Sequence, residues 1–324
     1  MSSFKRLWKH RTKDVELTLS DLHDYQELGS RYLMRNRFCA LFVDMGLGKT
    51  IMVITAMYRL LLRSRSLEMP SKVLIIGPRK VVCETWPTEF RKWRHGCLFD
   101  YSVVHGTAAQ RKEALLPQRD VYLISRDNIE WLVDYYGASW PFQWVIVDES
   151  SGFGDHASVR FKSLKKVRGR IHSLWELTAS PATEDDMKLF AQTWLLDRGE
   201  RFGDKITHFR ERYFTENRYT RQWKLRAGAE DEILEQVQDL CLTLKAKDHL
   251  PRDEPTERNW YVDLDDKSKA LYDSMEKDQV VSLDDAEVTT DTAAQTWLKL
   301  LQLASGFIYE GYIEYDPETD AAVK

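Results

Sequence analysis

Cysteine is scarce in this sequence, and the few cysteines lie far apart. The 324 residues include four of them, and no two form a C-x-x-C pair. This spacing argues against a structural zinc site and against a framework of disulfides. It favours an intracellular, reducing compartment, which is the cytoplasm or, in a eukaryote, the nucleus. The cysteines are Cys39, Cys83, Cys97 and Cys241.

Long hydrophobic runs are absent as well. No apolar stretch approaches the length that a membrane-spanning helix needs, and the N-terminus has no apolar core of the kind found in signal peptides. The sequence also has no internal repeat and no low-complexity tract. We therefore expect no membrane partner.

A surplus of positive charge is missing too. The formal net charge is −4, so any surface that binds nucleic acid must be local. Basic residues crowd residues 160–170 and 201–226, and a short basic cluster lies within residues 1–16. A hydrophobic content of 43% and eleven tryptophans indicate a globular chain. Its length allows one large α/β core with an appendage, or two modest domains.

What the sequence does contain is a glycine-punctuated turn between an apolar run and a helical pattern. Residues 40–43 are typical of a strand and residues 51–62 of a helix. The glycines let backbone N–H groups close on a phosphate, and the following helix adds the positive end of its dipole. Lys49 supplies charge to the outer phosphates, and the Thr50 hydroxyl can bind Mg²⁺. The predicted ATP-binding residues of this loop are Met45, Gly46, Leu47, Gly48, Lys49 and Thr50.

This phosphate-binding loop departs from the full G-x-x-x-x-G-K-[ST] pattern, because Val43 stands where a small residue is expected. The alternative is a glycine-rich turn beside a surface lysine. A second feature favours the nucleotide site, since the apolar run 143–147 ends in Asp148 and Glu149. Asp148 would hold Mg²⁺, and Glu149 would polarise the attacking water. Alone this acidic pair would indicate a solvated turn, but together with the loop it predicts an NTPase.

Short apolar runs alternate with helical patterns along the first half of the chain. This order predicts an α/β fold with a parallel sheet covered by helices on both faces. In such sheets ligands collect at the carboxyl ends of the strands. Four polar clusters fall at such ends, namely the phosphate loop, residues 78–80, residues 125–126 and residues 148–149.

Three further helices are expected at residues 21–35, 79–93 and 230–244. Ser20 is the expected N-cap of the first helix. Gln26 lies within that helix, upstream of the phosphate loop, and its amide can read the N6/N7 edge of adenine. A solvent-facing glutamine is the alternative.

Read in order, several segments carry a family likeness: Leu22–Gln26, Asp44–Thr50, Gly77–Arg79 with Trp86 and Glu89, Asp148–Glu149, Leu177–Pro181, Phe190–Gly203, and the stretches 264–274 and 297–306. Together they resemble the motifs of superfamily 2 helicase-like ATPases. The Met-Gly-Leu-Gly-Lys-Thr sequence and the Trp86–Glu89 pair are similar to motifs of the Swi2/Snf2 branch. The likeness runs from about Leu17 to Ile308.

The resemblance implies a RecA-like P-loop NTPase lobe, followed by a mainly helical C-terminal extension. It implies ATP and Mg²⁺ as cofactors, and double-stranded DNA, bound without sequence preference, as the partner. Gln26 would read adenine, Thr50 and Asp148 would hold the metal, and Lys49, Asp148 and Glu149 would be catalytic. Coupling of hydrolysis to DNA would fall to Thr178 and Ser180. The implied DNA-backbone contacts are Lys80, Ser125 and Arg126.

Three positions depart from the family pattern. Val43-Asp44 stand in place of an Asp-Glu pair before Met45, and Ala179-Ser180 in place of Gly-Thr. Ser150 and Ser151 follow the acidic pair where Ala or Gly and then His are common, which leaves the coupling at that point open.

We expect three parts: a basic tail at residues 1–16, the ATP-binding lobe at 17–245, and a linker with a helical connector at 246–324. The family's second RecA-like lobe carries arginines that stabilise the transferring phosphate, and the chain ends before such a lobe. Because those arginines contribute about 10³- to 10⁵-fold in rate, we expect weak ATP binding and slow hydrolysis by the isolated chain. The connector would dock a second motor lobe or a partner protein.

These features predict an ATP-dependent DNA translocase or helicase-like motor, here its N-terminal lobe. One alternative is an adaptor that binds nucleotide or DNA without ATP turnover. The other alternative is a metabolic P-loop kinase. The element at residues 178–181 and the lack of a recognisable substrate lid argue against it.

Overall fold

The computed structural model describes residues 17–63, 72–179, 187–217, 222–250, 261, 263–282, 287–290, 293–308, 314–315 and 322–323. The expected basic tail at residues 1–16 and the predicted site residue Ser180 lie outside these ranges. The chain divides into two compact units, Met1–Arg252 and Asp253–Lys324, and each is described by itself. The predicted boundary after residue 245 stays a prediction.

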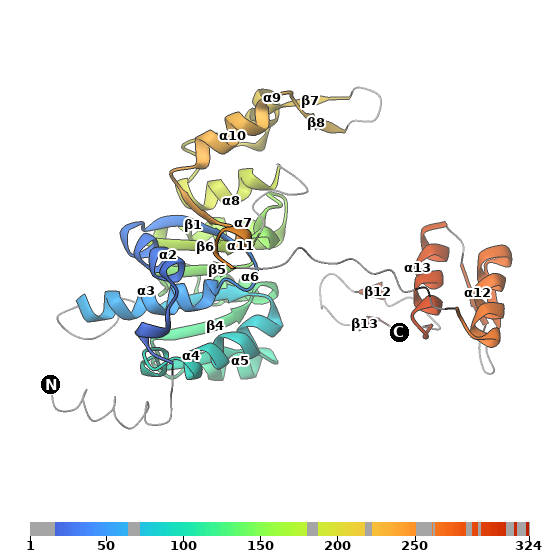
Figure 1. Cartoon of the computed structure of the whole chain (residues 1–324), viewed down its shortest axis with the longest axis horizontal. Helices are drawn as coiled ribbons and strands as arrows, with labels where there is room; N and C mark the ends of the chain where they lie inside the picture. Colours follow the sequence, from blue (N-terminus) through green and yellow to red (C-terminus); the bar gives the residue numbers. More distant parts are fainter. Residues whose placement is uncertain are drawn as a thin grey trace. The chain divides into compact units, whose positions relative to one another are not determined.

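The first unit is built on a seven-stranded sheet in which all neighbouring strands are parallel (Figure 1). Strands β1, β2, β4, β5 and β6 are buried along nearly their whole length, which is why they read as continuous apolar runs. The sheet confirms the predicted α/β class. Its strands, in spatial order, are β3 (Tyr101–Val104), β4 (Val121–Ser125), β2 (Val73–Gly77), β5 (Trp144–Asp148), β6 (Ser173–Thr178), β1 (Phe38–Val43) and β9 (Cys241–Leu244).

Helices cover both faces of the sheet, as predicted. One face carries α2 (Asp24–Arg35), α3 (Lys49–Arg63) and α4 (Trp86–Lys92); the other carries α5 (Ala108–Leu115), α6 (Ile129–Tyr136), α7 (Val159–Val167) and α8 (Lys188–Asp197). The remaining elements of this unit are α9 (Ile206–Tyr213), the hairpin of β7 (Phe214–Glu216) and β8 (Trp223–Leu225), α10 (Ala229–Val237) and α11 (Ala246–His249).

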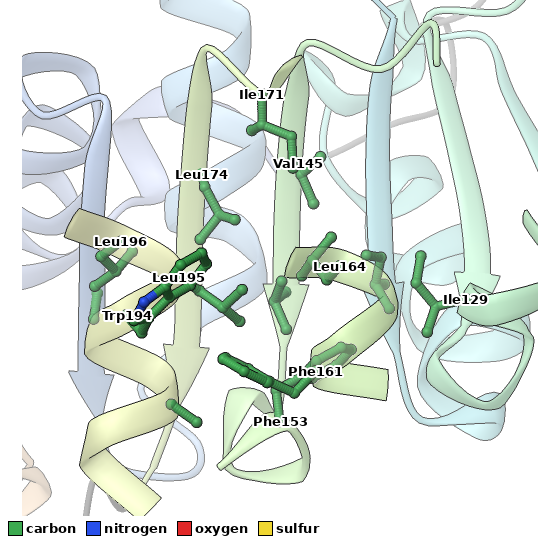
Figure 2. Packing of buried hydrophobic residues seen from close by; sticks show 14 of the residues in the cluster. Ile129, Val145, Phe153, Phe161, Leu164, Ile171, Leu174, Trp194, Leu195 and Leu196 are labelled. Atoms are coloured by element: carbon green, nitrogen blue, oxygen red, sulfur yellow. The ribbon is translucent and has the colours of Figure 1, made fainter. Parts of the chain in front are cut away.

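Alternating side chains of each strand supply two separate hydrophobic cores. On β5, Val145 and Val147 belong to the core beneath α6, α7 and α8, and Ile146 belongs to the core beneath α3 and α4. Figure 2 shows the first core, where Phe161 and Leu164 of α7 lie over the sheet. The carboxyl ends of the strands are therefore held by packing on both sides.

The first helix begins later than the sequence predicts. Thr18 and Asp21 close a short 3₁₀ turn of their own, with the Thr18 N–H donating to the Asp21 carboxylate at 2.7 Å. Leu22 is extended, and α2 begins at Asp24 with His23 as its N-cap. The expectation that Ser20 caps this helix is wrong, because the Thr18–Asp21 turn uses the local hydrogen bonds first.

The helix expected at residues 79–93 is interrupted by a π-helical turn at Val81–Thr85. Pro87 has no N–H to offer the preceding turn, so the regular i→i−4 ladder cannot run through it. The Trp86 N–H instead reaches the Val81 carbonyl, five residues back. Such π turns are common at functional sites, and this one precedes a tryptophan of the candidate site.

The helix predicted at residues 230–244 is wrong in its second half. It ends at Val237, and Cys241–Leu244 form the edge strand β9, parallel to β1. Leu244 is buried there, and the next residue but one, Ala246, donates its N–H to the Asp44 carboxylate at 2.7 Å. Pairing with β1 decides the conformation of this segment, and that pairing is invisible in a local pattern.

The second unit contains α12 (Asp266–Asp278) and α13 (Ala293–Ala304), which pack around a small core. Two antiparallel pairs accompany them, β10 (Val280–Ser282) with β11 (Glu287–Thr289) and β12 (Glu314–Tyr315) with β13 (Ala322–Val323). In the stretches the structure describes, no helix of either unit combines the length and apolarity needed to cross a membrane.

Candidate nucleotide-binding site

The glycine turn joins β1 to α3 through a backbone that glycine adopts most readily. Gly46 and Gly48 have φ angles of 85° and 82°, in the left-handed region. A Cβ at Gly48 would also lie 2.6 Å from Nε2 of Gln26. Leu47, between the two glycines, is fully buried and anchors the turn. The turn thus keeps bulky atoms away from the backbone that would face a phosphate.

Lys49 begins α3 and folds back over the turn. Its Nζ donates a hydrogen bond to the Val43 carbonyl at 2.8 Å. Burial lowers the pKa of Lys49, and the nearby carboxylates of Glu149, Asp148 and Asp44 oppose that shift. The ammonium therefore lies within electrostatic reach of the acidic pair at the end of β5, although β6 separates that strand from β1.

Gln26 joins α2 to the turn through its amide. Its Oε1 accepts from the His23 N–H at 3.1 Å, and its Nε2 donates to the Leu47 carbonyl at 3.2 Å. The side chain is buried, so both bonds fix the orientation of the amide. An amide has a second N–H and a second lone pair, which are the groups an adenine edge would need.

Asp148 is the last residue of β5, and a hydrogen bond orients each of its carboxylate oxygens. Oδ2 accepts from Nε1 of Trp86 at 2.9 Å, and Oδ1 accepts from the Glu149 N–H at 3.1 Å. Burial raises the pKa of Asp148 to about 6; the Trp86 bond opposes this, the Glu149 charge adds to it, and Lys49 opposes it. The same low-dielectric setting that penalises the free charge would strengthen its binding to a cation.

Glu149 has a left-handed backbone, with φ 54° and ψ 56°. For a residue with a Cβ this conformation costs about 1–2 kcal/mol, so its surroundings must impose it. Residues held in this way cluster at active sites. The turn redirects the chain directly after the buried Asp148.

One cavity of about 410 Å³ brings these groups together at the carboxyl edge of the sheet. Lys49 and Asp148 both line it, as a shared magnesium–nucleotide site requires. Leu47 lies behind the turn and does not line it. The lining residues are Gln26, Met45, Gly46, Gly48, Lys49, Thr50, Ile51, Val81, Thr85, Glu89, Lys92, Trp93, Asp148 and Glu149.

The oxygens around this cavity fit Mg²⁺. Thr50, Asp148 and Glu149 line it together, and all three offer hard oxygen atoms. Among the described residues, no group of three or more His, Cys, Asp or Glu side chains forms a dedicated metal cage. That is the donor set expected of Mg²⁺ held by one or two carboxylates and by substrate phosphates.

The wall formed by the π turn and α4 is the part of the site that sequence reasoning missed. Trp86 and Glu89 contribute to the family likeness, but the motif alone predicts no role for them. Glu89 lines the cavity and accepts from Nε1 of Trp93 at 3.1 Å, while Trp86 is fully buried against Asp148. In the sequence, the spacing of Trp86 and Trp93 was the signal that could have indicated this wall.

The described coupling residue Thr178 and the residues predicted to contact DNA lie outside the cavity lining. Thr178 is buried at the end of β6, opposite Phe42 of β1. Ser125 pairs in register with Gly77, and its hydroxyl donates to the Asp127 carboxylate at 3.1 Å. Arg126 follows it, half-buried, and Lys80 is exposed beyond the end of β2. They lie at or just beyond the carboxyl ends of β2, β4 and β6, at the same edge of the sheet as the cavity.

Known proteins resemble this chain in sequence and in fold. Protein p41 of Acyrthosiphon pisum secondary endosymbiont phage 1 is 32% identical over 295 residues, which are 88% of this chain and 64% of that protein. An uncharacterized ATP-dependent helicase of Mycoplasma genitalium is 30% identical over 162 residues, covering 47% of this chain and 15% of the helicase. The chain thus spans less than two thirds of the length of these relatives.

Among solved structures, the SWI2/SNF2 ATPase core of Sulfolobus solfataricus in complex with dsDNA has a similar fold. The TM-score is 0.56 at 19% identity, and the match covers 87% of this chain and 58% of that one. This likeness confirms the RecA-like architecture of the lobe. In sequence, the SNF2-related domain matches residues 25–305, which confirms the predicted Swi2/Snf2-type resemblance. The chain therefore belongs to the SNF2-related domain family, whose members include ATPase motors named as helicases and chromatin remodellers.

Proposed function

We propose that this chain is the ATP-hydrolysing lobe of a motor that moves along double-stranded DNA. The observation that carries the proposal is the single cavity of about 410 Å³ shared by Lys49 and the Asp148–Glu149 pair. Membership of the SNF2-related family and the fold shared with a dsDNA-bound ATPase core support it. All four cysteines are free, which suits a reducing intracellular compartment where ATP and DNA are found.

The geometry of the site allows a role for several of the lining residues. The glycine turn and the start of α3 would hold the phosphates, with Lys49 exchanging its bond to Val43 for a phosphate oxygen. Thr50 and Asp148 would hold Mg²⁺, which neutralises the charge that develops on the phosphates. Gln26 would present its amide to adenine.

Glu149 would act on the attacking water. Glu149 lines the cavity beside Asp148, and its left-handed backbone fixes the direction in which the chain leaves β5. A positioned general base contributes about 10²- to 10⁴-fold in rate. Thr178 and Ser180 would link this reaction to DNA held at Lys80, Ser125 and Arg126, through contacts to the backbone that carry no sequence preference.

Two substitutions test the proposal. Lys49→Ala should abolish ATP binding, and Glu149→Gln should keep ATP binding while lowering DNA-stimulated hydrolysis by about 10²- to 10⁴-fold. Lys166→Ala is the control, since Lys166 is exposed on α7 and does not line the cavity. ATP affinity and phosphate release on duplex DNA are the measurements. Unchanged ATP binding in Lys49→Ala would refute the assignment, and binding without turnover in the wild type would favour an adaptor.

A further inference from the structure

A second set of polar side chains lies buried behind the acidic pair, on the opposite face of the sheet from Trp86. Glu176 and Ser150 are fully buried, and Gln192 is 2% exposed. They come from β6, from the turn after Glu149 and from α8, respectively. Glu176 sits in register between Ala40 and Val147, both members of the apolar core drawn in Figure 2. A carboxyl group in such a core requires an explanation beyond packing.

Ser150 is the point where these side chains meet. Nε2 of Gln192 donates to the Ser150 Oγ at 3.0 Å. Burial raises the pKa of Glu176 well above its usual value, and the nearby Ser150 hydroxyl and the charge of Arg168 oppose that rise. The guanidinium of Arg168 is itself committed to the Leu195 and Leu196 carbonyls at the end of α8. Burial therefore favours the protonated form of Glu176.

The buried polar atoms of this region are short of hydrogen-bond donors. Within the described residues, both Glu176 carboxyl oxygens and the Gln192 Oε1 are buried acceptors without a hydrogen-bond partner. A proton on Glu176 would turn one of those acceptors into a donor. Buried hydrogen bonds such as that between Gln192 and Ser150 make the structure around them rigid.

Ser150 transmits that rigidity to Glu149. It begins the 3₁₀ turn Ser150–Phe153, in which the Gly152 N–H donates to the Glu149 carbonyl at 3.0 Å. Phe153, at the other end of the turn, is fully buried in the core of Figure 2. The left-handed backbone of Glu149 is thus imposed by a turn that is anchored at both ends.

We propose that Glu176 and Gln192 are positioning residues that clamp Ser150 and so hold Glu149 in its left-handed conformation at the cavity. This inference rests on the proposed function for the role of Glu149. Glu176 precedes the predicted coupling residue Thr178 by two positions, and Gln192 lies on the first helix after it.

The test compares two changes at one position in the full chain. Glu176→Met removes the polar atoms at similar volume, and it should lower kcat for ATP on duplex DNA by about 10- to 100-fold with ATP affinity unchanged. Glu176→Gln keeps a neutral hydrogen-bonding group and should restore kcat close to the wild-type value. The double variant of Glu176→Met and Gln192→Leu should lose no more kcat than either single variant, because both substitutions break the same network.

Leu174→Val is the matched control for packing, since Leu174 is fully buried on the same strand and in the same core. It should lower thermal stability without a selective loss of kcat. Hydrogen exchange of the amides at residues 149–153 gives a readout that needs no ATP turnover. Faster exchange there in Glu176→Met than in Leu174→Val is expected.

Equal exchange in the two variants, or full kcat in Glu176→Met, would overturn the inference. If the wild type neither binds nor hydrolyses ATP, the proposed function fails instead. The exchange experiment would still report whether the network holds the turn.

Discussion

The indole N–H of Trp86 donates to the Asp148 carboxylate at 2.9 Å, inside the core of the ATP-binding lobe. This bond comes from the helix wall across the cavity, while the backbone N–H of Glu149 binds the other carboxylate oxygen at 3.1 Å. Both bonds favour the ionised carboxylate, whereas burial disfavours it and raises the pKa of Asp148 to about 6. Trp86 therefore orients the carboxylate and favours its ionised form, which is the form that the proposed Mg²⁺ site needs.

Replacing Trp86 by Phe should weaken Mg²⁺-dependent ATP binding by about 10- to 100-fold, the usual effect of removing a partner that orients a ligand. The bond lowers the pKa of Asp148, so its loss should raise that pKa further. Titration of ATP binding with Mg²⁺ measures the effect. Trp93→Phe is the matched control, because Trp93 lines the same cavity but donates to Glu89. A similar loss in both variants would assign the effect to the shape of the cavity.

Gly48→Ala should disrupt the phosphate loop. A Cβ at this position meets Gln26 Nε2 at 2.6 Å, and φ is 82°, so the new side chain suffers both a clash and backbone strain. We expect loss of measurable ATP affinity and a stability decrease of at least about 1–2 kcal/mol. Gly169→Ala serves as the control, since a Cβ there meets nothing within 4 Å. Chemical denaturation and nucleotide binding would show the contrast.

Acid should destabilise the lobe through His95. This side chain is 2% exposed, its Nε2 hydrogen-bonds the Thr55 hydroxyl at 3.0 Å, and burial lowers its pKa from 6.5 to about 4. The unfolded chain therefore binds a proton more readily than the folded one. The stability that neutral His95 provides is complete above pH 6.5 and is lost as the pH falls towards 4, by about 3 kcal/mol in total.

Denaturation of the wild type and of His95→Gln across that pH range would isolate this contribution. The variant should be less stable at pH 7 but should lack the steep loss between pH 6.5 and 4. Asp148 acts in the opposite direction, because its raised pKa favours the folded state at low pH. Asp148 is present in both proteins, so its contribution cancels in the difference between their free energies of unfolding. The same change of unfolding free energy with pH in both proteins would contradict the prediction.

The DNA contacts proposed for Lys80 and Arg126 should appear in the salt dependence of binding. Each phosphate contact contributes about 0.9 to the slope of log K against log salt, so Lys80→Ala combined with Arg126→Ala should reduce that slope by about 2. Weakening should be uniform across DNA sequences. Lys277→Ala, an exposed charge on α12 of the second unit, should leave the slope unchanged. A slope that is insensitive to the double substitution would place the DNA elsewhere.

Much of the site could be predicted because its signals are local. The glycines of the phosphate loop are required by backbone angles of the turn itself, and Lys49 and Thr50 follow directly in the chain. The apolar run before Asp148 is readable because a strand buried on both faces must be apolar throughout. The start of α2 and the end of α10 were misjudged, because a Thr18–Asp21 turn and pairing with β1 outweighed helix propensity there.

The sequence alone therefore determined the phosphate loop, the acidic pair and the parallel order of the lobe, since each depends on neighbours in the chain or on the period of apolar residues. Only the tertiary structure decided that Trp86 orients Asp148 and that Gln192 hydrogen-bonds Ser150. Those relations join residues that are distant along the chain and meet through packing across the sheet. No local pattern encodes which distant side chain fills the space beside a buried carboxylate.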